Sequence, residues 1–124
     1  MRTVLADGEP TVRSALRALV TESLGMQVVG EADTSLALES QVQLEKPDLV
    51  IVAWNLIVTH AESVFASLHR SSRDLRVVVL DLRPETRHVA LAAGADGFIS
   101  MVDAPDVVLR VLRPGEMNDP GSLS

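Results

Sequence analysis

The chain has 124 residues, 47% of them hydrophobic, and a formal net charge of −6. This length suits one domain with one core, and the acidic balance argues against direct contact with nucleic acid, which needs clustered lysine and arginine. The absence of cysteine excludes disulfides, zinc thiolates and thiol nucleophiles, and no apolar run approaches the roughly 20 residues of a membrane span, so we expect a cytoplasmic protein without membrane contact.

Strand-like and helix-like patterns alternate along the first half of the chain. A short apolar run at 3–6 ends in a turn, and from Thr11 to Leu24 apolar residues recur at spacings of three and four, as in an amphipathic helix. A strand is then predicted over 26–32 and a second helix over 36–45. The apolar residues expected to pack inward from this second helix are Leu36, Leu38, Val42 and Leu44.

The stretch from Asp48 to Asn55 is the centre of the pattern. It contains a β-branched apolar run and predicts a strand that is buried on both faces, in the middle of a parallel sheet. Helices and strands continue to alternate beyond it. The remaining elements are predicted as a helix at 61–70, a strand at 76–80, a helix at 84–93, a strand at 97–100 and a helix at 105–113.

Five predicted strands that alternate with five predicted helices indicate an α/β domain with a doubly wound parallel sheet. For a chain of this size we predict the flavodoxin-like strand order 2-1-3-4-5, with helices on both faces. Ligands of such sheets bind at the carboxyl ends of the strands, near the point where the strand order reverses. We call the residues expected there the strand-end site: Asp7, Gly8, Ala53, Asn55, Asp81 and Met101.

These segments resemble the receiver domain of bacterial two-component response regulators. The resemblance covers residues 2 to about 113, and its character is that of the NarL/FixJ-type regulators, in which a helix-turn-helix DNA-binding domain follows the receiver. Each motif is short, but all of them stand in the order and spacing of the family. The matching motifs are Val4 to Pro10, Val28 to Ala32, Lys46 to Val52, Trp54 to Leu56 and Ala92 to Ser100.

The resemblance implies a role for the main positions of the strand-end site. A working receiver has two adjacent acids after its first strand, which hold Mg²⁺; here these positions are Asp7 and Gly8. The phospho-accepting aspartate at the end of the third strand is replaced by Ala53. The hydroxyl residue after the fourth strand is replaced by Asp81, and the lysine after the fifth strand by Met101. Only Asp7 matches the family.

The chemistry agrees with this comparison, because phosphoryl transfer depends on positioning and on charge stabilisation. Ala53 supplies no nucleophile, and Asp7 together with the Asn55 carbonyl is a poor set of ligands for Mg²⁺. We therefore predict a protein that is not an enzyme and has no catalytic residue, no metal and no cofactor. Arg83 is the basic residue closest to the site in sequence, and we expect it to pair with Asp81 or Asp7.

Other interpretations of these residues stay open. Asp81 could be a substitute phosphoacceptor, although a local ion pair or a cap for the next helix is the simpler explanation. Asp7, Glu9 and Asp81 could hold a metal if all three pointed to one mouth. Met101 makes the site more apolar, either by filling the space left by the missing acceptor or by favouring a small organic ligand. The three histidines show no ligand spacing and are predicted to be solvated.

The last predicted helix points to self-association. Its stretch from Val107 to Leu112 is apolar around most of the circumference, whereas a helix that covers one face of a sheet needs only an apolar stripe. The surplus predicts a second contact, with another copy of the chain. The residues predicted for this dimer surface are Val108, Leu109 and Leu112. The alternative is that Leu109 is simply an exposed leucine, which is common on protein surfaces.

The sequence thus predicts a receiver-like domain over 1–113 and a linker or tail over 114–124, leading to an absent helix-turn-helix output domain. Our first hypothesis is an interaction module of an atypical response regulator in transcription regulation, which works without phosphorylation and acts by dimerisation or partner binding. The alternative is a module whose altered strand-end site binds a small molecule that shifts the dimer equilibrium. A receiver that is phosphorylated on Asp81 is the third hypothesis.

Overall fold

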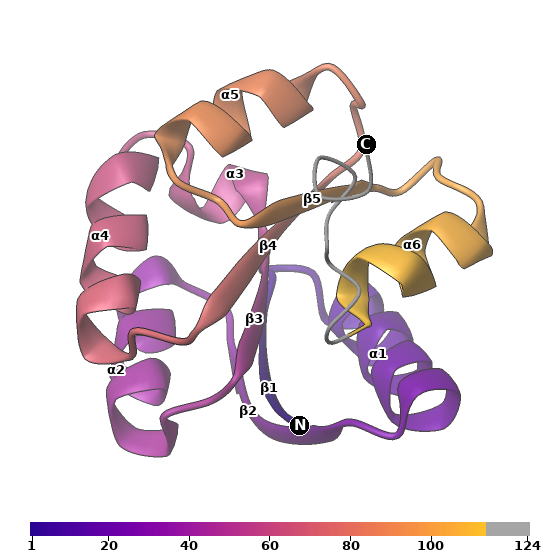
Figure 1. Ribbon diagram of the computed structural model, residues 1–124, viewed down its shortest axis with the longest axis horizontal. Coiled ribbons are helices and arrows are strands. Elements are labelled where there is room, and N and C mark those ends of the chain that lie inside the picture. Colours follow the sequence, from indigo (N-terminus) through magenta and orange to yellow (C-terminus); the bar gives the residue numbers. More distant parts are fainter. Residues whose placement is uncertain (114–124) are drawn as a thin grey trace.

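The computed structural model describes residues 1–113, which form one five-stranded parallel sheet with the order β2-β1-β3-β4-β5 (Figure 1). The predicted flavodoxin-like order is therefore confirmed. The strands are β1 (Arg2–Ala6), β2 (Gln27–Ala32), β3 (Leu49–Ala53), β4 (Arg76–Asp81) and β5 (Gly97–Ser100). The linker predicted over 114–124 lies outside the described residues.

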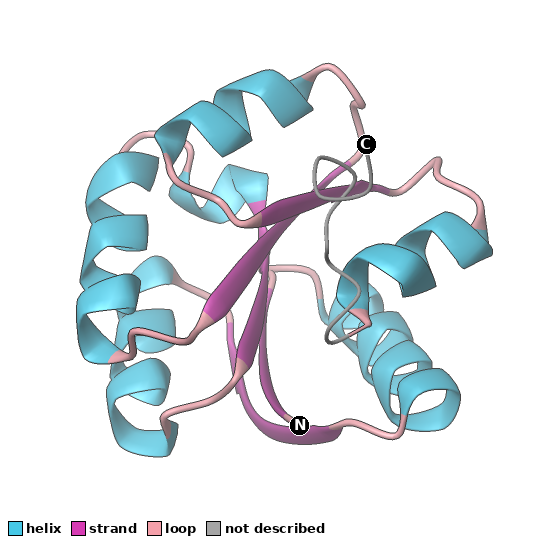
Figure 2. Ribbon diagram, viewed as in Figure 1, coloured by secondary structure: helices cyan, strands magenta, loops and turns pink. Residues whose placement is uncertain are grey.

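Helices cover both faces of this sheet, with α1 and α6 on one side and α2, α4 and α5 on the other (Figures 1 and 2). A short π-helical stretch, η1, continues α1 up to the turn before β2. The helical elements are α1 (Pro10–Ala18), η1 (Leu19–Ser23), α2 (Ser35–Glu45), α3 (Trp54–Ile57), α4 (Ala61–Ser71), α5 (Thr86–Ala93) and α6 (Pro105–Leu112). Within residues 1–113, none of these helices has the length and apolar character that a membrane crossing requires.

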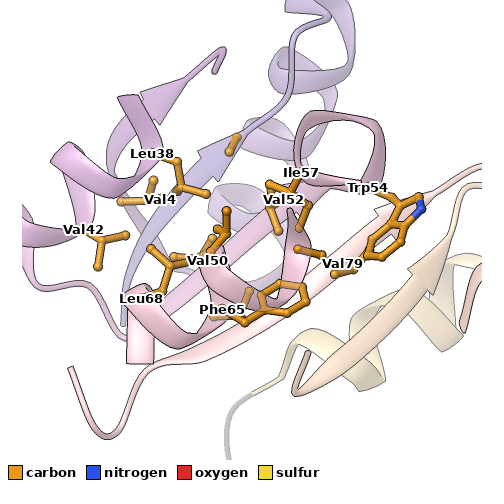
Figure 3. Packing of buried hydrophobic residues seen from close by; sticks show 14 of the residues in the cluster. Val4, Leu38, Val42, Val50, Val52, Trp54, Ile57, Phe65, Leu68 and Val79 are labelled. Carbon is orange, nitrogen blue, oxygen red and sulfur yellow. The ribbon is translucent and has the colours of Figure 1, made fainter. Parts of the chain in front are cut away.

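The central strand β3 is buried along its whole length, as predicted. Because successive side chains of a strand point to opposite faces, Val50 and Val52 pack toward α2 and α4, whereas Leu49 and Ile51 pack toward α1 and α6. Figure 3 shows the first of these two clusters. The side chains labelled there are Val4, Val50, Val52 and Val79 from the sheet, Leu38 and Val42 from α2, Trp54 and Ile57 from α3, and Phe65 and Leu68 from α4.

Two details of the second helix differ from the prediction. Leu38 and Val42 are buried, but Leu36 and Leu44 are 75% and 74% exposed. Leu38 and Val42 are four residues apart and therefore share the face that meets the sheet. Leu36 lies two residues before Leu38, a rotation of about 200° around the helix, and therefore faces solvent. The sequence could not show which apolar residues of α2 would face the sheet, because apolar residues occur around much of its circumference.

The edge of the sheet where the strands begin is held by a polar cluster around Arg76. Its Nη2 donates a hydrogen bond of 2.7 Å to the Val111 carbonyl of α6, while its Nη1 is buried without a hydrogen-bond partner among residues 1–113. Burial lowers the pKa of the Arg76 guanidinium from its usual value, and the charge of Asp96 acts in the opposite direction. Asp96 Oδ2 accepts a hydrogen bond from the Val77 amide and lies 2.8 Å from His69 Nε2. His69 is 32% exposed, so this contact with Asp96 lies at the surface of the domain.

Candidate functional site

The strand-end site is assembled by three neighbouring strands of the sheet. Ala6 is paired with Val52, and Ala53 is paired with Leu80, so the next residues, Asp7 and Asp81, flank the end of β3 on both sides. The sheet order thus brings the predicted positions together at one edge. What each side chain does there depends on its hydrogen bonds.

Asp7 is 5% exposed and is engaged by the loop that follows it. Its Oδ1 accepts a hydrogen bond of 2.8 Å from the amide of Glu9, an arrangement typical of turns that begin with aspartate. Its own amide donates to the Ala32 carbonyl at 3.0 Å. One carboxylate oxygen of Asp7 therefore stabilises the turn between β1 and α1.

Asp81 is engaged by the segment that leads into α5. Its Oδ2 accepts a hydrogen bond of 2.6 Å from the hydroxyl of Thr86 and lies 3.6 Å from Nε of Arg83. The predicted pairing of Arg83 with Asp81 is confirmed. Because the Arg83 side chain is exposed, such a pair contributes about 1 kcal/mol or less. The buried Thr86 hydroxyl, which we did not predict as part of the site, is the closer partner of this carboxylate.

Arg13 is a second residue that the sequence analysis missed. Its Nη1 donates a hydrogen bond of 2.6 Å to the Asp7 carbonyl, and its Nε pairs with Glu31 at 3.1 Å. Long helical side chains point back toward the N-terminus of their helix, so an arginine in the early part of α1 reaches the end of β1. This side-chain direction and the six-residue separation from Asp7 were the features of the sequence that indicated a contact between Arg13 and Asp7. Arg13 is thus engaged by the Asp7 carbonyl and by Glu31 and is not free to offer its charge to the strand-end site.

The position at which the resemblance places the phosphoacceptor is occupied by Ala53. Ala53 is 6% exposed and presents a methyl group to the site. At Gly8, a β-carbon would lie 3.9 Å from Cδ1 of Leu56, an ordinary van der Waals distance, so the missing second acid is not excluded by lack of space. Asn55 is exposed at the start of α3. The site therefore offers no nucleophile at the end of β3.

Met101 does not fill the space beside Ala53, contrary to one of our two interpretations of this residue. It is 52% exposed at the start of the loop between β5 and α6. The buried neighbour is Ser100. Its hydroxyl donates a hydrogen bond of 3.0 Å to the Leu82 carbonyl and accepts one of 3.3 Å from the Val102 amide. This serine connects the β5–α6 loop to the β4–α5 loop, while Met101 beside it is about half exposed.

These residues do not fit the Mg²⁺ ion that a working receiver holds. Glu9 is exposed, while the carboxylates of Asp7 and Asp81 are held by the Glu9 amide and by Thr86. Among residues 1–113, no three aspartate, glutamate, histidine or cysteine side chains gather in a way that could hold a metal ion. The arrangement around Asp7, Glu9 and Asp81 is thus a set of local turn and helix contacts.

The predicted dimer surface on α6 needs a correction. Leu112, the last residue of α6, is 0% exposed and packs in the core between the sheet and the helices α1 and α6. It therefore takes no part in a surface contact. Val108 is half-buried and packs against the same core. Leu109 is half-buried and belongs to neither core cluster. The apolar character of α6 is therefore explained in part by the domain's own core.

An apolar groove lies beside the strand-end site, between α1 and α6. Its volume is about 370 Å³, and buried side chains of α1, β4 and β5 form its floor. Residues that line it include Val12, Ala15, Leu16, Leu80, Met101 and Val108. The groove was not predicted, because it requires knowledge of how α1 and α6 are spaced on the sheet.

Known proteins share this architecture. The transcriptional activator protein ExaE of Pseudomonas putida is 35% identical over 115 residues, which cover 91% of this chain and 54% of that protein. The nitrate/nitrite response regulator protein NarL of Escherichia coli K12 is 28% identical over 122 residues, which cover 92% of this chain and 55% of that protein. The chain thus spans about half the length of these curated relatives.

Solved structures and family membership agree with the topology. A crystal structure of a LuxR-family two-component response regulator from Aurantimonas sp. SI85-9A1 has a TM-score of 0.76 at 22% identity, covering 89% of this chain and 81% of that one. Residues 3–111 match the family described as the response regulator receiver domain. Because this match takes in nearly all of the described residues, the chain belongs to the response regulator receiver domain family.

Proposed function

We propose that this chain is the phosphorylation-independent receiver domain of an atypical NarL/FixJ-type response regulator. The observation that carries the proposal is the buried methyl group of Ala53 at the end of β3, where the phospho-accepting aspartate of the family stands. Asp7 and Asp81, the acids on either side, accept hydrogen bonds from the Glu9 amide and from Thr86. Without a nucleophile and a matching cation, the phosphoryl group has neither an acceptor nor charge stabilisation.

The domain then acts through its surfaces rather than through a covalent modification. We propose that it associates with a second copy or with a partner protein and thereby positions a DNA-binding output domain that follows residue 124 in the full regulator. The relatives named above are a transcriptional activator and a response regulator, and this chain spans about half the length of each, which supports this assignment.

The test of phosphorylation independence uses Mg²⁺ with acetyl phosphate, and separately with beryllofluoride. We expect no gain of a phosphoryl group by mass spectrometry and no shift in melting temperature, because the site lacks an acceptor. The variant Asp81→Asn is the control for the remaining acid at the end of β4. A phosphoryl group on the wild-type chain that is lost in Asp81→Asn would establish Asp81 as the acceptor and disprove the proposal.

The test of self-association is light scattering over a concentration series of the 124-residue chain. We expect a dimer that Leu109→Glu weakens at least about tenfold, because a charge would be buried in the contact. The matched control is Leu36→Glu, on the opposite side of the sheet and exposed, which should leave the equilibrium unchanged. A wild-type chain that stays monomeric up to about 1 mM would exclude a functional homodimer of this domain alone.

A second candidate function is ligand sensing, in which a small molecule bound next to the strand-end site shifts the association equilibrium. The apolar groove between α1 and α6 favours it, because Met101 and Val108 connect the groove to the segment that carries Leu109. Such a ligand changes the equilibrium only if it binds one state more tightly than the other.

A further inference from the structure

The groove between α1 and α6 has the dimensions of a small-molecule site. Its volume of about 370 Å³ falls within the range of about 300–1,000 Å³ that is usual for ligand pockets. Its floor consists of Leu16, Leu80 and Ile99, which the fold already buries, so the floor is preformed. Ala15 on one wall and Val108 on the other come from the two helices that cover this face of the sheet.

The lining determines the chemistry of the occupant. Among residues 1–113, no charged side chain lines the groove, and the polar side chains of the lining are the hydroxyls of Thr11 and Ser100. The Ser100 hydroxyl is already bonded to the Leu82 carbonyl and the Val102 amide. Thr11, exposed in the first turn of α1, remains at the mouth as a group that can orient a ligand. A charged molecule would lose its hydration here without gaining a counter-charge.

The number of residues that line the groove, ten, argues against a protein segment as the occupant, because each side of a stable protein interface contributes about 20–30 residues. A stable protein interface buries about 800 Å² on each partner. Along α1, the exposed residues beyond the groove include Ser14 and Arg17, so polar side chains border the apolar lining on this side. A groove that ten residues line is smaller than such an interface and suits a compact molecule better than a helix or a second copy of the chain.

We propose that this groove binds a small, uncharged and largely apolar molecule between α1, the ends of β4 and β5, and α6. The inference deepens the ligand-sensing function proposed above and rests on it for its consequence. A ligand seated there contacts Met101, which is 52% exposed without it, and Val108 of α6. The bound molecule thereby biases the position of α6 and, with it, the surface around Leu109.

The test measures binding of the neutral naphthalene dye Prodan by its fluorescence, with amide chemical-shift mapping on the same samples. We expect saturable binding to the wild-type chain and shifts at α1, β5 and α6. Ala15→Phe fills the groove and should weaken binding at least about tenfold, because the probe and the new ring compete for the same volume. Ala18→Phe is the matched control, since Ala18 is also an exposed alanine of α1 but does not line the groove.

The charge of the probe provides a second arm. The sulfonate analogue of the same naphthalene should bind at least about tenfold more weakly, because the lining offers no cation. The proposal is overturned if Prodan shows no saturable binding, if Ala15→Phe and Ala18→Phe behave alike, or if the sulfonate binds equally well. A further contradicting result is a wild-type chain that binds no Prodan but dimerises in its absence, with Ala15→Phe abolishing that dimer. A second copy of the chain would then occupy the groove.

The acetyl phosphate assay on the same variants keeps the two proposals apart. Phosphorylation independence predicts that the wild-type chain and Ala15→Phe both stay without a phosphoryl group, whether or not Prodan binds to them. Failure of the groove to bind the probe therefore leaves the absence of phosphoryl transfer untouched, and the appearance of a phosphoryl group leaves the binding result untouched.

Discussion

Ala53→Asp is expected to destabilise the domain by about 3–5 kcal/mol at pH 7, although it restores the residue type that the family uses at this position. The new carboxylate would be buried at the end of β3, between Asp7 and Asp81. Among residues 1–113, no nearby cation is free to compensate this charge, because Arg13 is bound to the Asp7 carbonyl and Glu31, and Arg83 is exposed and lies beside Asp81. Urea unfolding measures the loss as a change in the free energy of unfolding.

The control is Ala53→Asn, which has the same size without the charge and should cost about 1–3 kcal/mol. Burial and the two neighbouring acids raise the pKa of the new aspartate in the folded state above its value of about 3.9 in the unfolded chain. The folded state then binds more protons, so stability falls as the pH rises from the unfolded pKa to the folded pKa, and the penalty is complete above the folded pKa. The gap between the Asp and Asn variants should therefore narrow as the pH is lowered from 7 towards about 5. Equal stability of the two variants at pH 7 would contradict this account.

Phe65→Ala is expected to cost about 3–5 kcal/mol, because Phe65 is among the largest fully buried side chains of the described residues. Phe65 lies on α4, next to the end of α5. A β-carbon added to Gly94 would be 3.2 Å from the Cβ of Phe65. Gly94 also has φ of +125°, so both its backbone and its contact with Phe65 require glycine. Truncation of Phe65 leaves a cavity that this rigid turn cannot close.

Thermal and urea unfolding of three variants test this expectation. Phe65→Leu keeps most of the volume and should cost about 1.5 kcal/mol or less, and Val89→Ala, an exposed position of α5, should change stability by less than about 0.5 kcal/mol. A loss below about 1 kcal/mol for Phe65→Ala would show that α4 and α5 repack around the missing ring.

Most strands were predictable because they carry short, β-branched apolar runs bounded by turn residues, although in β2 only Ala32 is buried. The centre of the sheet followed from β3, whose side chains are apolar on both faces. The four-residue helix α3 was missed, because it begins directly after β3 and is too short for a helical period to show. Its buried Trp54 and Ile57, three residues apart, were the only indication.

The backbone positions of the strand-end site were predictable, but the partners of its side chains were not. Asp7 and Asp81 follow their strands, so the sheet order alone brings them to one edge. The hydrogen bond from Thr86 and the reach of Arg13 depend on where α5 and α1 begin and how they are rotated. The assignment of Leu112 to a surface failed for the same reason, since an apolar helix does not reveal which side meets the sheet.

The bond between Arg76 and Val111 has a mechanical consequence for whatever follows this domain. It fastens the last turn of α6 to the beginning of β4, whereas the groove and Met101 lie where the strands finish. α6 has eight residues and spans about 12 Å, so its anchored residue Val111 and its groove-lining residue Val108 are less than one helical turn apart. Because Arg76 fixes the end of this short helix, a displacement at Val108 tilts α6 about Val111 instead of shifting the whole helix along the sheet.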